Sequence, residues 1–190
     1  DLDLVATDSI ELSGTDPADG RGSAIRINNR NTAAGGNITL AADQIRLTDG
    51  AAVFNLNQVG VESGGNIHMS AARGIRLHGS SQANTPIGSL ILQNNFNDLV
   101  QIFARLQLGS ADILTVGSAV DAAGSTGAIT LEAPVIELQD GAEVTTFAYG
   151  QASGDISLRA SDRLELSGRG GELTTGGEPA SDSAVQSRNP

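Results

Sequence analysis

The 190-residue chain contains no cysteine, no tryptophan and no lysine, and only 3% of its residues are aromatic. Without cysteine, neither disulfides nor thiolate metal sites contribute, and this absence suits an exported chain that stays unfolded before secretion. So few aromatic rings argue against a thick globular core. They also supply little of the ring surface that a carbohydrate-binding module uses to stack on sugars.

Charge of one sign is scarce as well, since eleven arginines stand against 22 acidic residues for a net charge of −11. An acidic surface argues against nucleic acid and anionic membrane as partners. With no signal peptide and no long apolar run, we expect no membrane insertion. The chain is instead rich in glycine, with 24 residues, and its apolar residues are mostly Ile, Leu, Val and Ala, which indicates a thin, stacked core.

The most informative feature is a repeated motif of two short apolar words. GGNITLAADQIRLTDGAAV begins at Gly35, and GGNIHMSAARGIRLHG, TGAITLEAPVIELQDGAEV, SGDISLRASDRLELSG and the opening DLDLVATDSIELSG follow the same pattern. Aligned on the first apolar residue, the copies start at Leu2, Ile38, Ile67, Ile129 and Ile156. Self-similarity at such a period is the mark of a solenoid.

The separation from the third to the fourth copy is about twice the others, which suggests a hidden sixth copy. Within it, IGSLILQNN at residues 87–95 matches RGSAIRINN at residues 21–29, which ends the first copy. We therefore expect the third copy to end near Asn95. A diverged sixth copy would then start near Val100.

A second reading treats part of this stretch as a helical excursion. Asp98 is a candidate N-cap, Gln101 follows three residues later, and Gly109 is a candidate end. We favour the extra copy because the period predicts its length. Residues 96–126 are thus assigned to a diverged coil or an extra-helical insertion.

A repeat of this size, with three short strands and glycine-rich corners, predicts one coil of a parallel β-helix. In the second copy the three sides are residues 38–40, 45–47 and 52–54. Alternation directs Thr39 and Arg46 outward. It directs inward Ile38, Leu40, Ile45 and Leu47. Six such coils, about 4.8 Å apart, would make a rod about 29 Å long.

Equivalent residues of successive coils should stack in columns. The outward column of the second side is Glu11, Arg46, Arg76, Gln107, Glu137 and Glu165. Short polar residues recur just before the first side, and they are Asp1, Asn37, Asn66 and Asp155. We interpret the first column as a solvated face and the second as a hydrogen-bonded ladder, since the glycine-rich calcium-binding repeat pattern is absent.

The repeats resemble a known family. The words GGNITLAADQIRLTDGAAV and TGAITLEAPVIELQDGAEVTTFAYGQASGDISLRASDRLELSG are similar to the β-helical repeat region of cyanobacterial filamentous-haemagglutinin-like proteins. So is the alternation of I-x-L-x-G-T/S coils with L-x-D-G-A-x-V coils. These proteins are exoproteins of two-partner secretion systems.

The resemblance implies an all-β, right-handed parallel β-helix of five to six coils, with residues 1–190 as a fragment of a longer solenoid. It also implies secretion to the bacterial cell surface, with an outer-membrane β-barrel transporter as partner of the full-length parent. The family's amino-terminal secretion domain, with its Asn-Pro-Asn signature, is not in this sequence. No residue here is therefore assigned to contact the transporter.

From these observations we expect a structural shaft of an adhesin-like exoprotein rather than an enzyme, and we expect no cofactor and no metal. Two alternatives stay open, because fold alone does not decide function. A polysaccharide lyase or hydrolase would bring several acids and an arginine together on one side over neighbouring coils. A carbohydrate-binding module would need exposed aromatic residues.

Few residues offer specific chemistry. His68 and His78 are the only imidazoles, and they are expected on the first side and at a later corner, too far apart to act together. Phe96 and Phe103 lie where the repeat breaks and are the candidate contacts for a glycan or cell-surface ligand. The alternative is that these two rings fill a locally wider core.

The ends of a β-helix expose unpaired strand edges. We therefore also expect end-to-end self-association of the fragment.

Overall fold

The computed structural model describes residues 1–14, 23–29, 34–57, 64–79, 112–118, 127–140, 142–149, 154–168 and 184–188. Within these ranges the chain is all-β, with parallel strands in two sheets and no helix. Accordingly, this part of the chain holds no helix that is long and apolar enough to cross a membrane.

Sheet 1 contains six strands and sheet 2 contains five. The strands of sheet 1 are β1 (Leu2–Val5), β2 (Ser9–Leu12), β4 (Ile38–Thr48), β6 (Ile67–His78), β8 (Ile129–Gln139) and β10 (Ile156–Ser167). The strands of sheet 2 are β3 (Ala24–Asn29), β5 (Ala52–Asn57), β7 (Asp112–Ser118), β9 (Glu143–Tyr149) and β11 (Ala184–Arg188).

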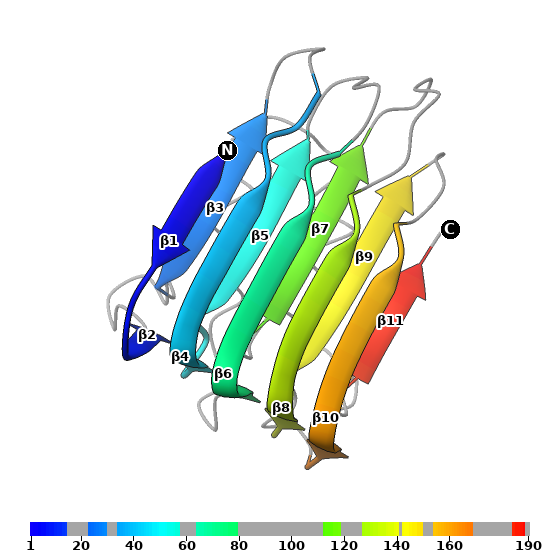
Figure 1. Cartoon of the computed structure of the whole chain (residues 1–190). Coiled ribbons are helices and arrows are strands. Elements are labelled where there is room, and N and C mark those ends of the chain that lie inside the picture. The colour runs from blue at the N-terminus through cyan, green and yellow to red at the C-terminus, as the bar shows by residue number, and fades with distance from the viewer. Residues whose placement is uncertain are drawn as a thin grey trace.

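The chain alternates between the sheets, so each pass adds one row to both. Sheet 1 runs β1-β4-β6-β8-β10 with β2 also on β4, and sheet 2 runs β3-β5-β7-β9-β11, which makes five rows. We number the rows along the chain, from row 1 (β1, β2, β3) to row 5 (β10, β11). Figure 1 shows the rows side by side, with sheet 1 in front of sheet 2.

The alignment of the repeats is confirmed by the pairing. The first residues of the five copies lie in one column of sheet 1, joined by Leu2↔Ile38, Ile38↔Ile67, Ile67↔Ile129 and Ile129↔Ile156. Because the side-chain period of a strand is two, this register also decides which residues of every copy face inward.

The expected sixth copy near Val100 is wrong. Strands β6 and β8 pair directly, so rows 3 and 4 are neighbours in sheet 1. In sheet 2, β7 pairs with both β5 and β9, and it therefore completes row 3. Residues 87–95 were expected in that place because their wording copies the first repeat, whereas the sequence of β7 does not. Residues 80–111, including the proposed helical excursion, lie outside the described ranges.

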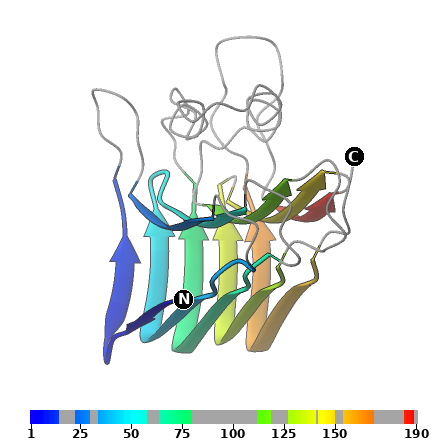
Figure 2. The same ribbon diagram turned by 90° about the horizontal axis from the view of Figure 1, so that it is seen from above.

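The first and second sides of a repeat are one strand in rows 2 to 5, not two separate short strands. Strand β4 has 11 residues and β6 has 12, and Figure 2 shows each long strand of sheet 1 turning sharply about its middle. The register shifts between Ala42 and Gln44, where the strand bends. The three-residue apolar words are thus the inward segments on either side of this bend.

The core lies between the bent sheet 1 and sheet 2. All four residues expected inward in the second copy are fully buried, namely Ile38, Leu40, Ile45 and Leu47. Val53 and Val144 of sheet 2 are fully buried as well and pack against them. Thr39 and Arg46 lie on the outer side as predicted, and the Arg46 side chain is 42% exposed.

Glycines stack where the chain enters sheet 1. A Cβ on Gly65 would lie 1.8 Å from the carbonyl oxygen of Gly36, and one on Gly127 would lie 1.9 Å from that of Gly65. Backbone therefore contacts backbone along this column, and no side chain fits between the rows. Gly50 also has a left-handed backbone conformation, at φ 81°, and Asp49 before it has φ 56°.

The glycine column generates a first prediction. Gly65→Ala places a methyl group against the Gly36 carbonyl, and we expect it to lower the free energy of unfolding by at least about 3 kcal/mol. Gly74→Ala, in the strand β6 that follows Gly65, is the matched control, because its Cβ would lie 3.3 Å from the Val135 carbonyl oxygen. We expect that variant to stay within about 1 kcal/mol of wild type in urea melts. Equal effects of the two substitutions would contradict the close contact.

Candidate functional site

The outer side of the second half of sheet 1 gathers charged side chains from all five rows. We call this surface the charged face, and it consists of Glu11, Arg46, Arg76, Glu137, Arg163 and Glu165. Gln107 was expected between Arg76 and Glu137, but those two residues are direct neighbours in register. That expectation is wrong for the same reason as the sixth copy, and Gln107 itself lies outside the described ranges.

Glu137 is the centre of the charged face. Its carboxylate is held from both sides, by Arg76 at 2.7 Å and by the guanidinium of Arg163. Arg163 also contacts Glu165 at 3.2 Å. The Glu137 side chain is only 10% exposed, so these bonds are shielded from water and are stronger than those of an exposed pair.

Arg46 and Arg76 are paired in register, which sets two like charges side by side in rows 2 and 3. Each guanidinium turns to a different acceptor. Arg46 contacts Glu11 at 3.2 Å and donates to Gln44 Oε1 at 2.6 Å. Arg76 contacts Glu137. Each of the two neighbouring arginines therefore pairs with an acid of the row on its other side, row 1 for Arg46 and row 4 for Arg76.

Beside the charged face is a small hollow of about 40 Å³ lined by Gln44, Gly74 and the three arginines Arg46, Arg73 and Arg76. Arg73 contacts Asp43 at 2.5 Å and Asp8 at 3.4 Å. Every arginine of the hollow therefore has a carboxylate partner. An anionic ligand would have to compete with these acids.

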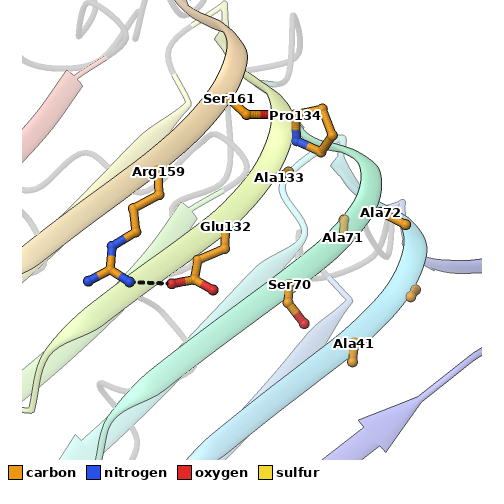
Figure 3. A pocket seen from close by; sticks show the side chains of 10 residues that line it. Ala41, Ser70, Ala71, Ala72, Glu132, Ala133, Pro134, Arg159 and Ser161 are labelled. Carbon is orange, nitrogen blue, oxygen red and sulfur yellow. Dashed lines mark hydrogen bonds and ion pairs between the residues drawn. The ribbon is translucent and has the colours of Figure 1, made fainter.

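A shallow groove of about 530 Å³ follows the bend of sheet 1, and Figure 3 shows it from close by. Small side chains of β4, β6 and β8 make its floor, including Ala41 and Ala71. Its charged lining residues are Glu132 and Arg159, which pair with each other at 2.6 Å. The groove is thus open and has an apolar base. At its other end, the opposite charges of Glu132 and Arg159 compensate each other.

The ladder predicted before the first side is confirmed for Asp1, Asn37 and Asn66 but not for Asp155, and its bonds differ from those expected. Asp1 Oδ1 accepts the N–H of Asn37 at 2.7 Å, Asn37 Oδ1 that of Asn66 at 2.9 Å, and Asn66 Oδ1 that of Ala128 at 2.8 Å. Each side chain therefore bonds the backbone of the next row rather than its own turn. Ala128 offers no side-chain acceptor to row 5.

The sequence analysis did not predict the buried polar residues Asn55 and Thr146 of sheet 2. Asn55 Nδ2 donates to the Gly36 carbonyl at 2.6 Å, and Thr146 Oγ1 donates to the Gly154 carbonyl at 2.9 Å. Both residues are 0% exposed. The available signal was a polar residue at an inward position of the third side. Their bonds tie sheet 2 to the glycine-rich entry into sheet 1.

The residues with candidate chemistry stay apart. His68 lies within the first half of β6, and His78 at the end of that strand contacts Asp140 at 2.9 Å and Gly79 O at 2.8 Å. Phe96 and Phe103 lie outside the described ranges. In the part of the chain that the structure describes, no three His, Cys, Asp or Glu side chains are grouped for metal binding.

The contrast between two ion pairs generates a second prediction. We expect Glu137→Gln to lower the free energy of unfolding by about 1–3 kcal/mol, because two arginines lose a shielded carboxylate. Glu132→Gln is the control, since the Glu132 side chain is 38% exposed and has one arginine partner. It should cost about 0–1 kcal/mol. Chemical denaturation in low and high salt separates the two, and a larger loss for Glu132→Gln would refute the ranking.

No protein-family model, no curated protein and no solved structure matches this chain. The wording of its repeats and the geometry of its rows are therefore the observations on which a function can be built.

Proposed function

We propose that this chain is a segment of a right-handed parallel β-helix that serves as a non-catalytic structural shaft of a secreted or cell-surface adhesin-like exoprotein. The observation that carries the proposal is the continuous register of both sheets over five rows. A fold whose rows repeat in this way grows only along one axis, so the number of rows sets its length. Five rows at about 4.8 Å span about 24 Å.

The way that the surface groups are used supports the same role. The shielded carboxylate of Glu137 joins rows 3, 4 and 5 through Arg76 and Arg163. Arg73 contacts acids of rows 1 and 2. These ion pairs help to keep neighbouring rows in one register. A structural shaft requires rows that do not shift relative to one another. The recognition element would then lie elsewhere in the parent protein.

The cellular setting is proposed from the resemblance of the repeats. A parent of this class would reach the surface of a bacterium through an outer-membrane β-barrel transporter. The lack of cysteine suits a chain that crosses a membrane unfolded. The net charge of −11 would keep the exported shaft from adhering to anionic surfaces.

A polysaccharide-active enzyme is the second candidate, and one observation favours it. Acids and arginines do gather on one face over neighbouring rows, as that reading requires. Their mutual pairing favours the shaft, because catalytic acids must be free to contact a substrate. The two candidates differ in a measurable product.

A row deletion tests the shaft. Removing residues 38–66 takes out one complete row and brings Leu2 opposite Ile67, in the register that Leu2 has with Ile38. We expect a cooperatively folded protein of lower stability, because one interface between rows is lost. Removing residues 38–67 is the control, since one more residue sets His68 opposite Leu2 and directs the inward side chains of β6 outward. If both deletions fold equally well by circular dichroism and thermal melting, the rows are not repeating units and the proposal fails.

Incubation with a panel of neutral and acidic polysaccharides tests the second candidate. We expect no shortening of any chain, as judged by size-exclusion chromatography of the products. If the wild-type protein shortens a polysaccharide and the Glu137→Gln variant does not, the protein is an enzyme rather than a shaft. Binding without cleavage that is lost in Phe96→Ala or Phe103→Ala, but kept in Phe54→Ala as a control for a ring elsewhere, would point to an adhesive module.

A further inference from the structure

The outer side of sheet 2 is buried in row 2. Along β5, alternation directs Val53 and Asn55 toward the core. Ala52 and Phe54 therefore stand on the opposite side of the sheet, yet they are only 3% and 5% exposed. Neither belongs to the core cluster between the sheets, and Figure 2 shows sheet 1 on one side of sheet 2 only. The cover of this outer side thus comes from outside the described strands.

The outer positions of sheet 2 are mostly apolar in rows 2 to 4. Leu114 is in register with Phe54, and a second column joins Leu56 to Val116 and Val116 to Phe147. We call these five positions the outer patch. The same two columns carry polar residues in rows 1 and 5, namely Arg26, Asn28, Gln186 and Arg188. A parallel sheet with apolar residues on both sides is covered on both sides, so the outer patch requires a partner.

The chain supplies the most material for a cover in row 3, on which the outer patch is centred. Residues 79–111 join sheet 1 to sheet 2 in this row, whereas only residues 49–51 do so in row 2. The corresponding connections of rows 1 and 5 are polar. Residues 15–22 hold no large apolar residue, and residues 169–183 hold only Leu173. The connection of row 3 is therefore the source that the sequence favours.

Residues 98–109 of this connection have the pattern of an amphipathic helix. Asp98 is the candidate N-cap and Gly109 the candidate end. Between them, one helical face would hold the apolar residues Leu99, Ile102, Phe103 and Leu106. A helix of this length spans about 18 Å. That length suffices to cross three rows spaced about 4.8 Å apart.

The position of this segment along the chain brings it to the outer patch. Gly109 lies close before Asp112, the first residue of β7, so their Cα atoms are within about 11 Å. Asp112 pairs with Ala52 at the edge of the outer patch. Arg105, near the end of the segment, is opposite in charge to Asp112 and to Glu143 beside it. The short tether and the charge therefore favour the same segment.

We propose that residues 98–109 pack their apolar face on the outer patch of sheet 2. This contact goes beyond the shaft role, because it gives this side of the stack a partner within the same chain. The packing removes the apolar surface of both partners from water, which drives it. It also leaves Phe103 facing the sheet, where the ring is not available to a glycan or cell-surface ligand.

Single cysteines test the cover, because the chain contains no other thiol. Ala52→Cys places the thiol on the outer side of row 2. Ala24→Cys places it at an exposed position in the same column of row 1, and Ala51→Cys places it in the core. Each is compared in the full chain and in a variant whose residues 98–109 are replaced by a glycine-serine linker of equal length. Reaction with a maleimide reports the exposure of each thiol.

We expect the thiol of Ala52→Cys to react slowly in the full chain and at least about tenfold faster after the replacement, because only local opening exposes it while the segment is packed. The thiol of Ala24→Cys should react fast in both chains. That of Ala51→Cys should react slowly in both, which shows that the replaced chain still folds. If the Ala52→Cys thiol stays slow after the replacement, another segment such as residues 58–63 is the cover and the proposal is wrong. A fast reaction of this thiol in the full chain would also refute it.

Cysteine pairs test the contact without removing the segment. Ala52→Cys combined with Phe103→Cys or with Leu106→Cys should give an intramolecular disulfide on mild oxidation in at least one of the two pairs. Ala104→Cys is the matched control, because it lies on the opposite side of the predicted helix, and its pair with Ala52→Cys should stay reduced. Disulfide-linked dimers would assign the cover to a second copy and overturn the proposal. Equal cross-linking of all the pairs, or of none, would do the same.

Discussion

Parallel pairing of each row with the next, in one register, is the constraint from which the other features of this protein follow. Apart from the bend, where the register shifts, the residues of sheet 1 have counterparts one strand spacing away, so each of these positions becomes a column through the structure. A column accepts only residues that tolerate their own neighbours at that distance. Aliphatic side chains stack inward, glycines stack where backbones nearly touch, and short polar residues stack where a side chain reaches the next N–H.

The same register would set identical charges against each other on the outer surface. The charged residue at a given position therefore changes from row to row. A strictly repeated arginine would face itself at every step, as Arg46 and Arg76 do at one step. Acids at the equivalent positions of rows 1 and 4 neutralise the pair. Among the acids of the charged face, Glu137 alone is shielded between two guanidinium groups. Elsewhere the exposed pairs contribute little.

The sides of the stack are linked by charge as well as by backbone pairing. Within the described ranges, the arginines of the charged face pair with acids of neighbouring rows. The proposed shaft role uses the length and rigidity that this continuous register gives the stack.

The sequence by itself determined the columns. Because a fixed period imposes the same surroundings on each copy, the alignment of Leu2 with Ile38 and Ile67 predicted which residues pair, which face inward and where the polar ladder lies. The alignment gave a wrong prediction where a segment with the sequence of a repeat does not take the place of that repeat in the sheet. Residues 87–95 copy the words of a third side, but β7, whose sequence matches them less closely, holds that place.

Only the tertiary structure decided the contacts made between the two sheets. Asn55 and Thr146 donate to the carbonyls of Gly36 and Gly154, because sheet 2 packs against the glycine-rich segments that lead into sheet 1. The sequence repeat does not predict this contact. Likewise, the bend that joins the first two sides into one strand depends on how sheet 1 wraps the core. Periodicity describes neighbours along a column, whereas these features depend on distances across the core, which the packing of inward side chains determines.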